Sequence, residues 1–422
     1  MEQQKILVVG NGMVGHRFID ELVARNTDGQ FAITTFAEES RLAYDRVQLS
    51  SFFSGKTADD LAMTSELAYQ ESGVTYFLNE KVVGIDPEKK TVVTNTGREE
   101  TYDKLVLATG SYPFVPPITG NDQPHCHVYR TIDDLENIAV SGKSSHRGVV
   151  VGGGLLGLEA ANALQNMGLE THVVEFAPRL MAVQLDEDGG ELLRRKIEDL
   201  GVNVHTEKAT TEIKAQSEGF RYRMKFADGS VLDTDMIVFS AGIRPQDELA
   251  RQCGLELGER GGIAINNLCQ TSHSDIYAIG ECAVWEKQVF GLVAPGYQMA
   301  RLVAANLCGE NGQFEGADMS TKLKLLGVDV ASIGDAQGKT PGAQSYTYHD
   351  GVAQIYKRII VSKEGDRLLG AVLVGDVEKY SQLLQLKLND MPLPENPAVL
   401  LLDVDGESEG ASGGVDALPD TA

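Results

Sequence analysis

Two glycine-rich turns carry the clearest chemical signal in the sequence. They are Gly10-x-Gly12-x-x-Gly15 and Gly152-x-Gly154-x-x-Gly157. In this spacing the first glycine permits a tight turn, the second lets the backbone approach a pyrophosphate, and the third lets a helix pack closely on the strand. Free N–H groups and the positive end of the helix dipole then face the phosphates. Two such turns in one chain predict two bound dinucleotides.

Each glycine turn stands where a predicted strand passes into a predicted helix. An apolar run over residues 6–9 precedes the first turn, and Phe18, Ile19 and Leu22 follow it at helical spacing. Residues 149–151 and an Ala- and Leu-rich segment frame the second turn in the same way. The glycine spacing indicates a dinucleotide-binding site only where it connects a strand to a helix in this way. One copy could be no more than a tight connection, but repetition of the whole pattern favours nucleotide binding.

An acidic residue at the end of the following strand completes each fingerprint, because its carboxylate accepts hydrogen bonds from the adenosine ribose. In the first unit this residue is Glu38, with Glu39 one position later as the alternative. In the second unit it is Glu175, whose charge would repel a 2′-phosphate and therefore favours NADH over NADPH. Arg179 lies nearby and would soften that preference.

The composition is that of a globular protein with two or three domains. The chain has 422 residues, more than one ordinary core accommodates, and its hydrophobic and charged fractions of 42% and 23% are ordinary. A formal charge of −24 argues against nucleic acid as a partner, since phosphate binding needs a basic face. No apolar run approaches the ~20 residues that span a bilayer, and no signal-peptide pattern opens the chain. We therefore expect no membrane association and a cytoplasmic location.

The five cysteines are scattered along the chain and predict no metal site. They are Cys126, Cys253, Cys269, Cys282 and Cys308. No pair has the C-x-x-C spacing of a zinc, iron–sulfur or dithiol site. Reduced, mostly buried thiols are therefore expected.

Three further stretches resemble flavoproteins that bind two dinucleotides. Residues 102–117, YDKLVLATGSYPFVPP, resemble the segment at which such chains leave the FAD domain, and residues 239–245, FSAGIRP, resemble the strand that returns to it. Residues 271–283, TSHSDIYAIGECA, resemble a late motif that ends in G-D, with Glu281 in place of the aspartate. The resemblance implies that FAD occupies the first site. Its further contacts would be Thr109, Gly110, Gly280 and Glu281.

Over nearly its whole length the chain resembles the N-terminal reductase module of the NAD(P)H-dependent nitrite reductase large subunit. The stretches that carry this resemblance are VGNGMVGHRFI, AYDRVQLSS, VVGGGLLGLEAA, FSAGIRP, IYAIGECA, FGLVAPGYQMA and KLKLLGVDV. The resemblance implies electron flow from NADH through FAD to an iron–sulfur acceptor. In that family a [2Fe-2S] domain follows, and then a part with siroheme and a [4Fe-4S] cluster. The sequence stops at Ala422, before such cysteines, so we expect nitrite reduction itself to need parts outside it.

The resemblance also implies a fold class and a domain plan. The fold would be α/β, with two Rossmann-like dinucleotide-binding domains of the glutathione-reductase type and a smaller C-terminal α+β domain. The FAD-binding domain would comprise residues 1–115 and 242–316, and the NAD(P)H-binding domain residues 116–241. The C-terminal domain would comprise residues 317–397, and a tail would comprise residues 398–422. Strand patterns fill most of the C-terminal domain, and a short helix is predicted over residues 380–388. The tail is rich in Gly, Ser, Asp and Glu, which predicts a flexible acidic linker.

Few side chains are expected to act as acids or bases, because the cofactors carry the chemistry. Related ferredoxin reductases pair a glutamate at the position of Glu159 with a lysine beside the flavin. In the matching stretch here, YDRVQLSS, Ser51 takes the place of that lysine. Glu159 would then face Arg46 or water, or be an ordinary solvated helix residue. Pro295 suits the first turn of a helix whose N-terminus would face the flavin ring.

Residues 42–55, LAYDRVQLSSFFSG, are informative for what they lack. Disulfide-reducing relatives place a reactive cysteine in this region, whereas the nearest cysteine here is Cys126. Thiol–disulfide chemistry is therefore not expected, and electrons would leave the flavin for a metal centre outside the chain.

Several alternatives stay open at the level of the sequence. The chain could be a free-standing NADH:ferredoxin or rubredoxin reductase, an NADH oxidase, or a non-catalytic sensor of flavin and NADH. The resemblance further implies a small nitrite reductase subunit and a second copy of the chain as partners. The electron acceptor, the flavin potential and the natural C-terminus are not determined by these patterns.

Overall fold

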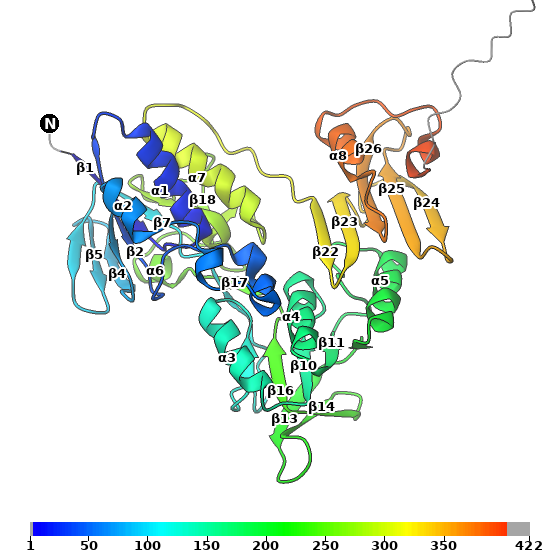
Figure 1. Cartoon of the computed structure of the whole chain (residues 1–422). Coiled ribbons are helices and arrows are strands. Elements are labelled where there is room, and N and C mark those ends of the chain that lie inside the picture. Colours follow the sequence, from blue (N-terminus) through cyan, green and yellow to red (C-terminus); the bar gives the residue numbers. More distant parts are fainter. Residues whose placement is uncertain (1–2, 403–422) are drawn as a thin grey trace, which may run out of the picture.

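The computed structural model describes residues 3–402 and folds them into three domains (Figure 1). We name them the N-terminal domain (residues 3–115 and 242–316), the middle domain (116–241) and the C-terminal domain (317–402). The first two each contain a parallel sheet with helices, and the third contains an antiparallel sheet. The predicted α/β fold class with a smaller C-terminal α+β domain is confirmed.

The N-terminal domain is built on a parallel sheet in the order β19-β7-β1-β2-β3. Its strands are β1 (Gln4–Val9), β2 (Phe31–Phe36), β3 (Thr75–Phe77), β7 (Lys104–Leu107) and β19 (Ile276–Ala278). Its helices are α1 (Met13–Arg25), α2 (Glu66–Glu71), α6 (Glu248–Gln252) and α7 (Val293–Leu307), with short 3-10 helices η1 (Arg46–Ser54), η2 (Asp59–Leu61) and η3 (Gly280–Cys282). Helix α1 begins within the first glycine turn, directly after Gly12, and packs beside α7, as Figure 1 shows in blue and yellow-green.

Small additional sheets complete the N-terminal domain. One sheet consists of β4 (Val82–Asp86), β5 (Thr91–Thr94) and β6 (Glu99–Thr101). A mixed sheet consists of β18 (Ile263–Ile265), β20 (Ala283–Trp285) and β21 (Gln288–Val289). The antiparallel pair β8 (Ser111–Pro113) and β17 (Ile243–Pro245) lies where the chain leaves this domain and returns to it.

The middle domain repeats the same plan with a parallel sheet in the order β12-β11-β10-β16-β9. Its strands are β9 (Cys126–Val128), β10 (Arg147–Val151), β11 (Glu170–Val174), β12 (Asn203–His205) and β16 (Met236–Phe239), and its helices are α3 (Ile132–Gly142), α4 (Leu155–Asn166) and α5 (Glu187–Asp199). Strands β13 (Thr210–Ala215), β14 (Tyr222–Phe226) and β15 (Val231–Thr234) form an antiparallel sheet. The buried valines of β10 lie centrally because apolar strands of a parallel sheet are covered on both faces.

The C-terminal domain is an antiparallel sheet in the order β22-β23-β26-β25-β24. Its elements are β22 (Thr321–Leu325), β23 (Val328–Gly334), β24 (Gln344–Asp350), β25 (Ile355–Val361), β26 (Leu368–Val374), α8 (Tyr380–Leu388) and η4 (Pro397–Leu401). Helix α8 spans the residues predicted for it. Leu400 and Leu401 of η4 are buried in the core of this domain. The rest of the predicted tail, residues 403–422, lies outside the described residues.

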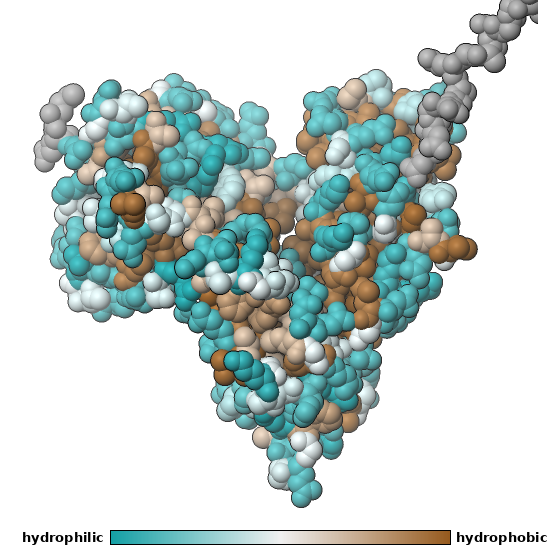
Figure 2. All heavy atoms as spheres, in the orientation of Figure 1, coloured by the Kyte–Doolittle hydropathy of each residue, from teal (hydrophilic) through white to brown (hydrophobic). Residues whose placement is uncertain are grey.

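The C-terminal domain rests on the middle domain, against α5 and α4. The two domains share one apolar core, in which Leu192 and Leu193 of α5 lie with Tyr356 and Val372 of the sheet. Figure 2 shows a notch between the N-terminal domain on the left and the C-terminal domain on the right. In residues 3–402, no helix has the length and apolar character needed to cross a bilayer.

Candidate functional site

Both glycine turns have a geometry that excludes a side chain. Gly10 and Gly152 have φ angles of +107° and +121°, and a Cβ added to them would lie 2.3 and 2.2 Å from backbone carbonyl oxygens. A Cβ at Gly15 or Gly157 would lie 2.1 or 2.0 Å from the carbonyl oxygen of the first glycine in its own turn. The first and third glycines are therefore needed for the turn and for the close approach of the helix.

The middle glycine of each turn faces open space. A Cβ at Gly154 would have no neighbour within 4 Å, and a Cβ at Gly12 would meet only the Arg46 Nε atom at 4.0 Å. These two glycines are also the N-cap residues of α4 and α1, and neither helix has a side-chain cap. The helix N-termini therefore keep unsatisfied N–H donors beside an accessible backbone, which fits a pyrophosphate at each turn.

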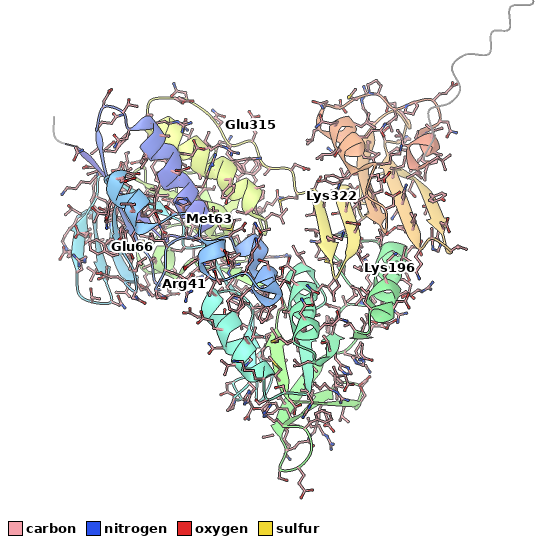
Figure 3. All side chains as sticks on the ribbon, viewed as in Figure 1. Arg41, Met63, Glu66, Lys196, Glu315 and Lys322 are labelled. Atoms are coloured by element: carbon pink, nitrogen blue, oxygen red, sulfur yellow. The ribbon has the colours of Figure 1, made fainter. Side chains whose placement is uncertain are left out.

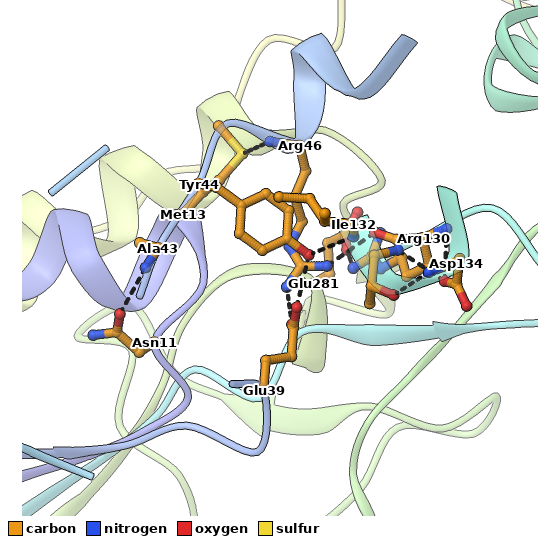
Figure 4. Close-up of polar contacts among 11 residues, drawn as sticks. Asn11, Met13, Glu39, Ala43, Tyr44, Arg46, Arg130, Ile132, Asp134 and Glu281 are labelled. Atoms are coloured by element: carbon orange, nitrogen blue, oxygen red, sulfur yellow. Dashed lines mark hydrogen bonds and ion pairs between the residues drawn. The ribbon is translucent and has the colours of Figure 1, made fainter. Parts of the chain in front are cut away.

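Arg46 lies over the first glycine turn in a group of polar side chains shown in Figure 4. Its guanidinium forms an ion pair with Glu39 and lies 4.7 Å above the ring of Tyr44, whose hydroxyl donates to Glu39 at 2.7 Å. Burial alone would lower the pKa of Arg46, but its interactions with Tyr44 and the Glu39 carboxylate raise it, so the guanidinium stays cationic. A fixed cation at this position suits a ligand that carries phosphates.

The same group crosses from the N-terminal domain to the middle domain. Arg46 donates to the Arg130 carbonyl oxygen at 3.0 Å, and the Arg130 guanidinium donates to Glu281 at 2.7 Å. Ser111 also donates to Glu281 at 2.7 Å. At the outer edge of this boundary Arg41 pairs with Asp133 of α3 at 2.9 Å (Figure 3).

Three more predicted residues lie around Glu281. Gly110 has a φ of +69°, and a Cβ there would lie 3.7 Å from an Arg130 nitrogen. The Thr109 hydroxyl donates to the Gln246 carbonyl oxygen at 2.7 Å. Gly280 has a φ of +79°, and a Cβ there would touch the Val14 side chain of α1 at 3.2 Å. The structure therefore brings these residues and the first glycine turn to one place.

The two candidate ribose-binding glutamates of the first unit point in different directions. Glu38 is exposed and pairs with Lys81 at 2.8 Å. Glu39 is half-buried and faces Tyr44 and Arg46. The alternative residue is thus the one that points toward the glycine turn, because Glu38 lies on the outward side of the chain after β2.

In the second unit Glu175 lies directly beside the glycine turn. Its carboxylate accepts hydrogen bonds from the backbone N–H groups of Gly153 at 2.5 Å and Ala177 at 2.6 Å. Arg179 is turned away from it and donates to the Leu185 carbonyl oxygen at 3.1 Å. The basic residue that was expected to soften the preference for NADH therefore has another partner.

Glu159 is paired neither with Arg46 nor with Ser51. The Ser51 hydroxyl donates to the Gln48 carbonyl oxygen at 2.6 Å, and Arg46 is engaged as described above. Within residues 3–402 the buried Oε2 atom of Glu159 has no hydrogen-bond partner, and burial raises the pKa of this carboxyl to about 7. The buried Tyr129 hydroxyl likewise has no partner there, and its pKa is raised by burial and by the charge of Glu159. Two neighbouring buried polar atoms without partners indicate a place for a polar ligand or water.

Pro295 is the third residue of α7 and is buried, in agreement with a place in the first helical turn. A Cβ at the next residue, Gly296, would lie 2.6 Å from the Val14 side chain and 3.1 Å from the Gly280 Cα atom. The N-terminus of α7, which has no side-chain cap, therefore packs against α1 and η3. Its positive dipole end lies at the same site as the first glycine turn.

Two residues of this site have no marker in the sequence pattern. Asn11, within the first glycine turn, accepts from the Ala43 backbone N–H at 3.0 Å and donates to the Tyr69 hydroxyl at 2.9 Å. It thereby fixes the loop that carries Arg46. Tyr129 was missed because a tyrosine after a short strand is usually a core residue.

The thiols do not form a redox or metal centre in the described part of the chain. All five cysteines are free, with Cys269 and Cys282 buried and the other three half-buried. Burial raises the pKa of Cys126 to about 11 and that of Cys269 to about 12. No group of three or more His, Cys, Asp or Glu side chains in residues 3–402 could hold a metal ion.

Comparison with known proteins gives the chain a family. The pyridine nucleotide-disulphide oxidoreductase model matches residues 4–300, and the rubredoxin NAD+ reductase C-terminal domain model matches residues 320–387. The chain is 56% identical over 422 residues to the NADH nitrite reductase large subunit of Escherichia coli (strain K12), covering 100% of this chain and 50% of that protein. It is 57% identical over 422 residues to the NAD(P)H nitrite reductase large subunit of Klebsiella oxytoca, covering 100% of this chain and 44% of that protein.

The chain therefore spans about half the length of the curated relatives it matches. Among solved structures, a NAD-dependent persulfide reductase from A. fulgidus superposes with a TM-score of 0.82 at 26% identity, covering 93% of this chain and 80% of that one. The resemblance found in the sequence motifs is confirmed. The chain belongs to the pyridine nucleotide-disulphide oxidoreductase family.

Proposed function

We propose that the chain is an FAD-dependent, NADH-oxidising reductase module of the nitrite reductase type, which passes electrons to an iron–sulfur acceptor. The observation that carries the proposal is the pair of open, uncapped glycine turns, one in each of two domains whose boundary is crossed by the contacts of Arg46, Arg130 and Glu281. Family membership implies FAD and NAD(P)H as the two nucleotides. The chain covers only about half of each nitrite reductase relative, and the other half of such a protein could supply the electron acceptor.

The N-terminal domain would hold FAD through Gly10, Gly12 and Gly15 at the N-terminus of α1. Arg46 lies above that turn and would neutralise the pyrophosphate, and Glu39 or Glu38 would accept the ribose hydroxyls. When bound, FAD supplies the chemistry that the side chains lack, since it accepts a hydride and gives up electrons one at a time. Thr109, Gly110, Gly280 and Glu281 would position its middle part, and the end of α7 that contains Pro295 would face its ring.

The middle domain would hold NADH through Gly152, Gly154 and Gly157 at the N-terminus of α4. Glu175 lies beside this turn, where its carboxylate would accept the adenosine ribose hydroxyls and disfavour a 2′-phosphate. Glu159 holds a proton on its buried carboxyl below a pH of about 7, because burial disfavours its charged form.

The partners and the location follow from the same proposal. A small nitrite reductase subunit and a second copy of the chain are further proposed partners. Because all five cysteines are free, a cytoplasmic location, where thiols stay reduced, suits the chain. The [2Fe-2S], [4Fe-4S] and siroheme groups of the family would belong to parts outside these 422 residues.

Anaerobic titration of the purified chain with NADH tests the proposal. We expect a yellow protein whose flavin absorbance bleaches with NADH and which then reduces ferricyanide but not nitrite. A colourless protein that takes up no FAD, or a flavin that NADH does not bleach, would contradict the proposed function.

A free-standing reductase of a small iron–sulfur protein is the second candidate function. The match of residues 320–387 to the rubredoxin NAD+ reductase C-terminal domain favours it. Rapid reduction of separately added rubredoxin by this chain would support the second candidate, and fast turnover with oxygen alone would instead indicate an oxidase. Flavin reduction without turnover on any acceptor would indicate a sensor.

A further inference from the structure

The C-terminal domain reaches the proposed NADH site through Gln337, which lies in the loop between β23 and β24. The Gln337 amide nitrogen donates to the Leu185 carbonyl oxygen at 2.8 Å and to the Val183 carbonyl oxygen at 3.3 Å. Its amide oxygen accepts from the Arg179 guanidinium at 3.3 Å. Gln337 thus holds both the side chain of Arg179 and the backbone that follows it.

The loop that carries Gln337 is itself well anchored. Ala336, the preceding residue, is buried in the core shared with the middle domain. The Asp335 carboxylate accepts from the backbone N–H groups of Lys339 at 2.9 Å and Thr340 at 2.7 Å. The backbone that carries Gln337 is therefore already fixed. Its hydrogen bond with Arg179 costs little additional conformational entropy.

The backbone of Arg179 lies close to the place where the adenosine ribose would bind. It follows Glu175 by four residues, and the neighbouring Met181 backbone N–H donates to the Gly153 carbonyl oxygen of the glycine turn at 2.9 Å. The Arg179 stem packs on α5, where a Cβ at Gly190 would lie 2.9 Å from it. An arginine with such a backbone position is a natural ligand for a 2′-phosphate.

We propose that Gln337 is a specificity-determining residue, which keeps the chain selective for NADH by holding Arg179 away from the ribose 2′ position. The inference rests on the proposed function, because it assumes that Glu175 and its glycine turn bind the adenosine half of the dinucleotide. Glu175 disfavours the 2′-phosphate directly, and Gln337 holds back Arg179, a nearby cation that would offset the charge of Glu175. The C-terminal domain thereby takes part in choosing the dinucleotide.

Calorimetric titration of the full chain with NAD+ and with NADP+ tests this role. In Gln337→Ala we expect NADP+ to bind about tenfold more tightly, corresponding to about 1.4 kcal/mol, with the NAD+ dissociation constant unchanged. Gln337→Met, which keeps the packing volume, should show the same gain if Gln337→Ala folds poorly. The gain should vanish when Arg179→Ala is added, and Arg179→Ala alone should leave NAD+ binding as it is.

Two results would overturn the inference. One is an unchanged NADP+ dissociation constant in both Gln337 variants while NAD+ still binds normally. The other is a gain in NADP+ affinity that persists after Arg179→Ala. Failure of the proposed function would look different, because the unaltered chain would then bind neither NAD+ nor NADP+.

Discussion

Replacement of Glu159 by glutamine removes a buried acid whose protonation state changes near neutral pH. Its pKa is about 7 in the folded chain, against an ordinary value of 4.5, and the cause is burial. The folded state therefore binds this proton more tightly than the unfolded chain does. Glu159 lowers the free energy of unfolding progressively as the pH rises from about 4.5 to about 7, and the loss is complete above that range.

The magnitude follows from the size of the pKa change. A rise from 4.5 to about 7 corresponds to about 3 kcal/mol, because one pKa unit is worth about 1.4 kcal/mol. Glu159→Gln should therefore be more stable than the unaltered chain at pH 8, by up to about 3 kcal/mol, and nearly equal to it at pH 4.5. The buried amide still needs a hydrogen-bond partner, which makes this figure an upper bound.

Urea unfolding at several pH values between 4.5 and 8, followed by circular dichroism, measures this difference. Glu71→Gln is the matched control, because Glu71 ends α2 and is exposed. The control should follow the unaltered chain at every pH. Parallel stability curves for Glu159→Gln and the unaltered chain across this range would refute the reasoning, since they would mean that Glu159 titrates at its ordinary value.

Three further substitutions test the framework of the site. Asn11→Ala leaves the buried Ala43 N–H without its acceptor, which should cost about 1–3 kcal/mol and speed the loss of bound FAD on dilution. Asp186→Ala removes the carboxylate that accepts from Tyr356 at 2.5 Å and Arg358 at 2.8 Å. This should cost about 3 kcal/mol or more and expose the segment between α7 and β22, residues 308–320, to proteolysis. Gly157→Ala places a Cβ 2.0 Å from the carbonyl oxygen of Gly152, so NADH should no longer bleach a flavin that is still bound.

Each of these three has a distinct contrary outcome. Asn11→Ala with unchanged flavin release would show that the loop carrying Arg46 does not depend on Asn11. Unaltered proteolysis of Asp186→Ala would show that the shared apolar core alone holds the C-terminal domain. Normal NADH affinity in Gly157→Ala would place the dinucleotide elsewhere, and Gly351→Ala, at an exposed position where a Cβ meets nothing within 4 Å, is its control for a general effect of added volume.

The glycine turns and their flanking elements could be predicted because local rules govern them. A strand, a turn that needs positive φ and a helix are specified within about 20 residues of sequence. Gly10 and Gly152, with φ angles of +107° and +121°, show the conformation that their spacing indicated. The helix over residues 380–388 was predicted for the same reason, since its apolar spacing is local.

The partners of individual side chains could not be predicted, because they come from segments far apart in the sequence. Burial raises the pKa of Glu159, and among residues 3–402 no other segment gives its buried Oε2 atom a hydrogen-bond partner. The sequence also could not decide between Glu38 and Glu39, since adjacent residues after a strand point to opposite sides. Only the fold shows that Glu39 meets Arg46.

By itself the sequence determined the α/β class, the two nucleotide turns and the family, since these depend on local spacing and on motifs that repeat within the chain. Tertiary structure alone decided how the domains meet: Arg46 reaches Arg130 across 84 positions, and Gln337 reaches Arg179 across 158. Such contacts depend on how separate cores pack together, and no pattern within one segment encodes that packing.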